Sequence, residues 1–135
     1  MVVISDIDGT LAVRVDRGPF EWHRLLEDKP NDSAIEVLHA LHARGHEIIF
    51  ISGRTEDLRT QTVLWHSRNI GLPGKLLMRK TNDNRRDDTV KAEIFMDLNL
   101  TSENVLLVLD DRDRVVKMWR EKFGLRCFQV GEGNF

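Results

Sequence analysis

The chain has 135 residues, 41% of them hydrophobic and 31% charged, and this balance indicates one compact globular domain over residues 1–135. The formal net charge of -2 excludes a bulk attraction to nucleic acid or anionic membranes, so a polyanion would need a local basic patch. The single cysteine, Cys127, excludes an internal disulfide, and the sequence shows no leader and no membrane-spanning segment. We therefore expect a cytoplasmic protein with no membrane partner.

Apolar runs rich in β-forming residues alternate along the chain with segments of helical periodicity. In chain order, the patterns predict strand 2–5, helix 31–44, strand 47–52, helix 55–70, strand 75–78, helix 88–98, strand 105–109, helix 112–123 and strand 125–130. Residues 13–30 and 79–86 show no clean period, and we interpret both as loops or flaps near the strand ends. The alternation favours right-handed crossovers and an α/β fold with a five-stranded, doubly wound parallel sheet.

Polar and charged residues follow the predicted strands at the points where these strands end. Asp6 and Asp8 follow the first strand, and residues 52–54 close the second. Residues 110–112 follow the fourth strand, and Lys91 lies early in the helix after the third. In a doubly wound parallel sheet, ligands bind beyond the carboxyl ends of the strands. We therefore expect these residues on one rim of the molecule.

Two aspartates flank a single residue after the first predicted strand. Like charges this close repel each other, which is costly in a partly desolvated cleft unless a cation neutralises them. Mg²⁺ accepts one or two carboxylates and takes its other ligands from water and phosphate oxygens. The sequence therefore predicts a Mg²⁺ site formed by Asp6 and Asp110, with Asp8 contributing its backbone carbonyl oxygen.

The same residues can support phosphoryl transfer. A carboxylate can attack phosphorus directly, and Asp6 is placed to form an aspartyl phosphate. Asp8 can protonate the departing alkoxide and then take a proton from water. Ser52 and the neighbouring backbone N–H of Gly53 can hold phosphoryl oxygens, while Lys91 offers a positive charge for the negative charge that develops.

Four motifs occur in order on these elements: DIDGT at residues 6–10, ISGR at 51–54, Lys91, and LDDR at 109–112. This set resembles the haloacid dehalogenase (HAD) superfamily of aspartate-nucleophile phosphohydrolases, which implies a HAD-like (Rossmannoid) three-layer fold. With RGPF, RRDDTVKAEIF, DDRDRVVKMWR and CFQVGEGNF, the chain is also similar, nearly from end to end, to the 3′-phosphatase domain of phage-type polynucleotide kinase-phosphatases. The short spacers between motifs leave room for little or no cap domain.

The resemblance implies roles at the matching positions. The implied catalytic and metal-binding residues are Asp6 (nucleophile), Asp8 (general acid and base), Lys91 with Asp87 or Asp88 nearby, Asp110 (metal ligand) and Asp111 (carboxylate supporting the metal). The implied substrate-binding residues are Thr10, Arg17, Gly53, Arg54 and Arg86. The implied substrates are 3′-phosphate ends of DNA or RNA, with 2′,3′-cyclic phosphates and nucleoside 3′-monophosphates as further candidates.

Two other functions stay open from the sequence. A HAD phosphatase for nucleoside monophosphates or other small phosphate monoesters would use the same catalytic residues, usually under a larger cap. A non-catalytic module that binds nucleic-acid ends would keep the arginines but would not need Asp6. No G-x-x-x-x-G-K-[ST] motif is present, so we expect no kinase activity from these residues. A separate or fused kinase and the oligomeric state stay open.

Simpler interpretations compete at several positions. Asp111 could only cap the following helix. Solvated surface positions are the alternative for Arg85, Arg86 and Arg112. The aromatic residues divide into helical core positions, Trp65 and Trp119, and candidates for stacking on nucleobases, Phe20 and Trp22. The five histidines lack the spacing of a zinc site.

Overall fold

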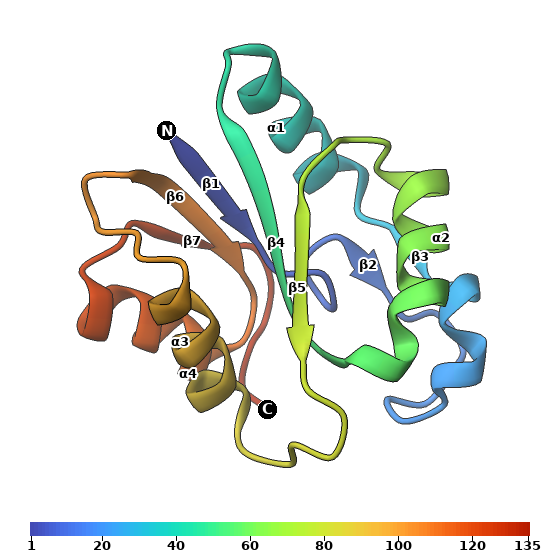
Figure 1. Ribbon diagram of the computed structural model, residues 1–135. Helices are drawn as coiled ribbons and strands as arrows, with labels where there is room; N and C mark the ends of the chain where they lie inside the picture. Colours follow the sequence, from blue (N-terminus) through green and yellow to red (C-terminus); the bar gives the residue numbers. More distant parts are fainter.

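The structure is a computed structural model that describes residues 1–135. A five-stranded parallel sheet in the order β5-β4-β1-β6-β7 forms its centre (Figure 1). Its strands are β1 (Val2–Ser5), β4 (Glu47–Thr55), β5 (Lys75–Arg79), β6 (Val105–Asp110) and β7 (Cys127–Gln129). The predicted α/β fold and its five parallel strands are confirmed. The last strand is shorter than predicted, because only Cys127–Gln129 pairs with β6.

Four α-helices connect the strands: α1 (Asp32–Ala43), α2 (Arg59–Asn69), α3 (Asp87–Asp97) and α4 (Asp113–Lys117). Local signals explain the bounds of α1. The Asn31 side chain accepts a hydrogen bond from the backbone N–H of Ala34, and Gly45, just past the helix end, has a φ of +94° that side chains rarely tolerate.

Two predicted helices are less regular than their sequence period suggested. A 3-10 turn, η2 (Glu56–Leu58), precedes α2, so the α-helix begins four residues later than predicted. The segment predicted as one helix over 112–123 consists of α4 followed by a π-helical stretch, η3 (Met118–Lys122). Such π-helical turns often occur next to functional sites, and η3 carries Trp119, which reaches the site described below.

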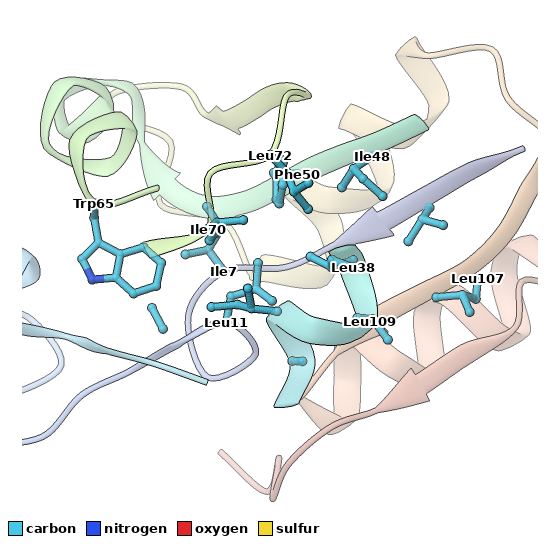
Figure 2. Close-up of a cluster of buried hydrophobic side chains, with 14 of the residues drawn as sticks. Ile7, Leu11, Leu38, Ile48, Phe50, Trp65, Ile70, Leu72, Leu107 and Leu109 are labelled. Carbon is cyan, nitrogen blue, oxygen red and sulfur yellow. The ribbon is translucent and has the colours of Figure 1, made fainter. Parts of the chain in front are cut away.

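Successive strand residues point to opposite faces of the sheet, and both faces are buried. Val3 of β1 belongs to a core cluster with side chains from α1 and α2, whereas Ile4 belongs to a cluster with side chains from α3, α4 and η3. Figure 2 shows the first cluster, which includes Phe50 and Ile48 of β4 and Leu38 of α1. Helices thus cover both faces of the sheet, which confirms the predicted three layers (Figure 1).

Residues 14–28, which we call the flap, connect two short strands. β2 (Ala12–Val13) and β3 (Lys29–Pro30) pair in the antiparallel direction, and the flap carries the 3-10 helix η1 (Trp22–Glu27). The sequence predicted only a loop over 13–30, because a two-residue strand pair and one irregular helix leave no readable period. The small size of the flap agrees with the predicted lack of a large cap domain.

β1 lies in the middle of the sheet, with β4 on one side and β6 on the other. Its last residue, Ser5, pairs with Phe50 of β4 and Leu109 of β6. The chain winds from β1 through β4 to β5 and then crosses to β6 and β7, so the winding direction reverses at β1. In such sheets the ligand site lies beyond the carboxyl end of the strand at this reversal. None of the helices has the length and apolarity needed to span a bilayer.

His66 of α2 has a buried Nε2 atom without a hydrogen-bond partner. Its ring lies edge-on to Phe50, with 4.4 Å between the centroids, and burial lowers the pKa of His66. Below about pH 6.5 the unfolded chain therefore binds a proton here more readily than the folded chain, and stability falls as the pH falls.

We expect His66→Phe to reduce the loss of melting temperature between about pH 8 and about pH 5, because the variant has no titrating group at this position. Circular dichroism of both proteins over this range measures the effect. Parallel profiles of melting temperature against pH would contradict the prediction.

Candidate active site

A cleft of about 910 Å³ lies at the carboxyl ends of the strands, lined by the flap and by the loop after β5. Of its 27 lining residues only five are hydrophobic, while nine are lysine or arginine and seven are aspartate or glutamate. The cleft therefore suits a charged ligand. It also gathers the local basic groups that a polyanion would need on a chain whose net charge is -2.

Three aspartates converge on the floor of this cleft. Asp6 follows β1, Asp110 ends β6, and Asp111 comes next; one carboxylate oxygen of each lies within 4.8 Å of the others. All three residues are buried. The predicted meeting of the first-strand and fourth-strand aspartates is therefore confirmed. The third carboxylate of the cluster is Asp111, whereas the side chain of Asp8 lies in a different network.

Lys91 supplies a positive charge inside the cluster. Its Nζ donates to Asp6 Oδ1 at 2.7 Å and to Asp110 Oδ2 at 3.0 Å, and its side chain is buried. Burial alone would lower the pKa of Lys91, but the charges of Asp110 and Asp6 raise it above its ordinary value. Burial raises the pKa of Asp6 well above its ordinary value, although Lys91 opposes this effect. The lysine is thus fixed as a cation against both aspartates.

Asp111 adds a further negative charge to the same buried space. Burial and the charge of Asp110 raise the pKa of Asp111. It does not cap α4, whose N-cap residue is Arg112 and which has no side-chain cap hydrogen bond. Three carboxylates beside one ammonium group leave two negative charges without a partner, which is unfavourable in a desolvated site.

The residues of the cluster fit a hard divalent cation. All of the candidate ligands are carboxylate oxygens, with no thiolate or imidazole among them. Such donors suit Mg²⁺, and its two charges would balance the excess in the cluster. Asp6, Asp110 and Asp111 would hold the ion, and the predicted contribution of the Asp8 backbone carbonyl oxygen stays a prediction.

Asp8 belongs to a second network on the flap side of the cleft. Arg54 Nε and Nη2 donate to the two carboxylate oxygens of Asp8 at 2.9 and 2.7 Å, and Arg17 Nη2 lies 3.9 Å from Asp8 Oδ1. The buried Asp28 accepts from Arg17 Nε and Nη2 at 2.7 and 2.8 Å and from Arg54 Nη2 at 3.5 Å. Two arginines therefore alternate with two aspartates, and these charge-assisted bonds fix the position of Asp8.

Arg17 and Arg54 were predicted to bind substrate, and the structure gives both of them partners within the chain. They are 5% and 2% exposed, and both guanidinium groups lie over the ring of Trp22, at 4.9 and 5.5 Å from its centroid. Arg54 Nη1 also donates to Thr62 Oγ1 at 3.1 Å. The arginines thus position Asp8, and their contact with substrate stays a prediction.

Ser52 and Thr10, two further predicted site residues, are fully buried. Ser52 Oγ accepts a hydrogen bond from the backbone N–H of Arg54 at 3.1 Å and donates to no group of the chain. Ser52 does not line the cleft, so its predicted contact with phosphoryl oxygens stays a prediction. Thr10 Oγ1 donates to Asp6 Oδ2 at 2.9 Å, so its contact in the structure is with the predicted nucleophile.

Gly53 and Arg86 both line the cleft, as predicted substrate-binding residues should. Arg86 is exposed and pairs with Asp88 at 3.1 Å. Asp87, the other acidic candidate near Lys91, lines the cleft itself and contributes to the raised pKa of that lysine. The contacts of Gly53 and Arg86 with substrate stay predictions.

No site role was predicted for several residues that the structure places there, among them Asp28, Arg79 and Trp119. Arg79 ends β5 and pairs with Asp87, which holds the following loop against the cleft. Trp119 lies in the core as predicted, but its Nε1 also donates to Asp110 Oδ2 at 3.2 Å. The tendency of a buried indole N–H to find an acceptor was the only signal that could have indicated this contact.

Comparisons of sequence agree with this geometry. Residues 1–135 match the family described as the phosphatase domain of polynucleotide kinase PNKP. A protein of Autographa californica nuclear polyhedrosis virus, whose name refers to polynucleotide kinase and RNA ligase activities, is 31% identical over 123 residues. That match covers 88% of this chain and 18% of the viral protein.

Two solved structures of a Pnkp1/Rnl/Hen1 complex, one described as an RNA repair complex, contain a chain with 36% identity and TM-scores of 0.93 and 0.91. Each match covers 99% of this chain but only 43% and 47% of the other. The class C acid phosphatase of Bacillus anthracis shares the fold at 14% identity, with a TM-score of 0.61 over 97% of this chain and 66% of that one. The chain spans less than half the length of the relatives that it matches in sequence, so it corresponds to one part of them. It belongs to the family of HAD-type phosphatase domains of polynucleotide kinase PNKP.

Proposed function

We propose that this domain is a polynucleotide 3′-phosphatase, which with Mg²⁺ hydrolyses 3′-phosphate ends of DNA or RNA, and also 2′,3′-cyclic phosphate ends of RNA. The observation that carries the proposal is the convergence of Asp6, Lys91, Asp110 and Asp111 on the floor of one charged cleft. The flap borders this cleft without a cap domain to close it, which leaves room for the end of a polymer.

In the first step, a carboxylate oxygen of Asp6 attacks phosphorus, and the bond between phosphorus and the 3′ oxygen breaks. Lys91 holds Asp6 Oδ1 and Thr10 holds Asp6 Oδ2, so the carboxylate is oriented before substrate binds. Asp8 donates a proton to the departing 3′ oxygen. The step leaves a 3′-hydroxyl end and an aspartyl phosphate on Asp6.

In the second step, water attacks the phosphorus of the aspartyl phosphate while Asp8 takes a proton from that water. Asp6 leaves as a carboxylate and inorganic phosphate is released. The two hydrogen bonds from Arg54 hold the Asp8 carboxylate in place for both proton transfers. Mg²⁺ held by the aspartate cluster would offset the charge of the phosphoryl oxygens.

The test is phosphate release from oligonucleotides of one sequence that carry the phosphate at the 3′ end or at the 5′ end. We expect release from the 3′ end in Mg²⁺, loss of this release in EDTA, and little release from the 5′ end. Equal turnover of the two ends would contradict the proposal. Faster turnover of nucleoside monophosphates and sugar phosphates would favour the alternative, a phosphatase for small phosphate monoesters. Matched DNA, RNA and cyclic-ended substrates determine the preferred end.

A close backbone approach at Gly9 positions Asp111 and leads to a second test. A Cβ atom on Gly9 would collide with the Asp111 carboxylate, and the φ of Gly9 is +79°. We expect Gly9→Ala to lose about 1–2 kcal/mol of stability from the backbone conformation. The variant should also lose most of its phosphatase activity, because the metal-binding carboxylate is displaced.

Gly45→Ala is the matched control for this variant. Gly45 has a similar φ of +94°, and no atom lies within 4 Å of its added Cβ. This control should lose stability without losing activity per folded molecule. Equal specific activities of the two variants, measured below their melting temperatures, would contradict a role of Gly9 in positioning Asp111.

The relatives support a proposal about the wider setting of the domain. The solved chains belong to an RNA repair complex, and the name of the viral relative refers to kinase and ligase activities. We propose that this domain acts beside a kinase, fused or separate, in the repair of nucleic-acid ends. The single buried cysteine fits the cytoplasmic location expected from the sequence.

A further inference from the structure

The cleft has two chemically different walls. Apart from Phe135, its apolar and proline lining comes from one short stretch that joins the end of β2 to the flap: Val13, Val15, Pro19, Phe20 and Trp22. The loop after β5 contributes only polar and charged residues, among them Arg85 and Arg86. A nucleic-acid strand has the same asymmetry, because its bases have apolar faces and its backbone is charged.

Phe20 is the aromatic side chain of this wall whose ring faces are free. It is 86% exposed, and no cation or aromatic ring lies against it. Trp22, in contrast, lies beneath the guanidinium of Arg17, and Phe135 lies 4.5 Å from that of Arg112. Phe20 lines the cleft together with the exposed Val13 and Val15, and a nucleobase would cover its ring by stacking.

Arg14 is the cation of the flap that has no partner in the chain. Arg17 is paired with Asp28, and Arg24 is paired with Asp16 and Glu27. Arg14 is exposed, lines the cleft, and makes neither a hydrogen bond nor an ion pair. Its five N–H donors are therefore available to a phosphate group.

We propose that the flap binds the last nucleotide of the strand, with Phe20 stacked on the 3′-terminal base and Arg14 on the internucleotide phosphate at its 5′ side. The inference rests on the proposed function, because the terminal phosphate has to reach Asp6 when the base lies on the flap. Asp6, Arg14 and Phe20 line the same cleft. Its volume of about 910 Å³ is in the range of sites that hold whole organic ligands, far beyond the need of one phosphate group.

The first test compares two 3′-phosphorylated oligonucleotides that differ only in the terminal base, which is present in one and replaced by an abasic sugar in the other. We expect the unmodified domain to have a KM at least about 5-fold lower for the base-bearing end, the effect of one stacked base. Phe20→Ala should remove this advantage. Phe128→Ala, which changes another exposed aromatic residue outside the cleft lining, should keep it.

The second test concerns the internucleotide phosphate. We expect the unmodified domain to have a lower KM for a 3′-phosphorylated dinucleotide than for a nucleoside 3′-monophosphate, and Arg14→Ala should reduce this difference. The variant should also reduce the slope of log KM against log salt by about one charge. Arg126→Ala, which removes an exposed arginine outside the cleft lining, is the control and should keep the slope.

The inference is overturned if the unmodified domain shows no preference for the terminal base, or if Phe20→Ala keeps that preference in full. An equal loss on base-bearing and abasic ends would also overturn it, because it would assign Phe20 a structural role. These results differ from failure of the proposed function itself, in which the unmodified domain would release no phosphate from any 3′ end.

Discussion

Asp6→Asn will abolish phosphate release from 3′-phosphorylated oligonucleotides, with a residual rate at least about 1,000-fold below that of the unmodified domain. An amide cannot attack phosphorus to form the acyl phosphate. The substitution also removes a negative charge beside Asp110 and Asp111, so the melting temperature without divalent cations should not fall. Loss of activity without loss of stability would show that Asp6 reacts and does not merely support the fold.

The control for this variant is Asp57→Asn, because Asp57 is exposed and its side chain makes no hydrogen bond. A direct readout is acid-quenched protein after brief mixing with a 3′-[³²P]-labelled oligonucleotide. The unmodified domain and the control should retain covalent label, and Asp6→Asn should retain none. A rate within about 10-fold of the unmodified domain would refute the covalent route.

Asp28→Asn will lower both the stability of the domain and its rate of phosphate release. Asp28 is buried between Arg17 and Arg54, and without its charge Asp8 is the only carboxylate left in contact with either guanidinium group. Breaking a buried ion pair by removing one partner costs about 3–5 kcal/mol. In the proposed mechanism, Asp8 also loses the arginine arrangement that positions it for proton transfer.

The loss of stability and the loss of proton transfer by Asp8 can be separated by comparing substrates with different leaving groups. In the proposed mechanism a 3′ alkoxide takes a proton from Asp8, whereas p-nitrophenolate is a weak base and leaves without one. At a temperature where the variant is folded, we expect the rate with a 3′-phosphorylated oligonucleotide to fall about 100-fold or more. The rate with p-nitrophenyl phosphate should fall far less. Glu27→Gln, which removes an exposed partner of Arg24, is the control. Equal losses with both substrates would mean that Asp28 does not act through Asp8.

The residues that meet at the carboxyl edge of the sheet could be predicted, because the order and direction of the strands determine which residues lie there. Asp6 and Asp110 end neighbouring parallel strands, so their meeting follows once the apolar runs are assigned to a parallel sheet. The bounds of α1 follow from local signals at Asn31 and Gly45. Lys91 was found by its place in a motif, since a lysine on a helix has no periodic signal of its own.

The flap side of the site could not be predicted, because its contacts depend on tertiary packing. Asp28 is important through Arg17 and Arg54, which lie 11 and 26 residues away in sequence. No helical or strand period links these positions. The sequence left Asp111 between a helix cap and a catalytic group, and it is the cluster with Asp6 that assigns it to the site.

The ion pair between Lys91 and Asp6 joins residues 85 positions apart, and Thr10 contacts Asp111 across 101 positions. Asp6 therefore leaves the ribosome long before the strand that carries Asp110 is synthesised. Contacts over such separations form late, because the loop entropy must be overcome first. A nascent chain that has not yet reached Asp110 holds Asp6 without its neighbours, so the aspartate cluster is complete only after the strand that ends at Asp110 has been synthesised.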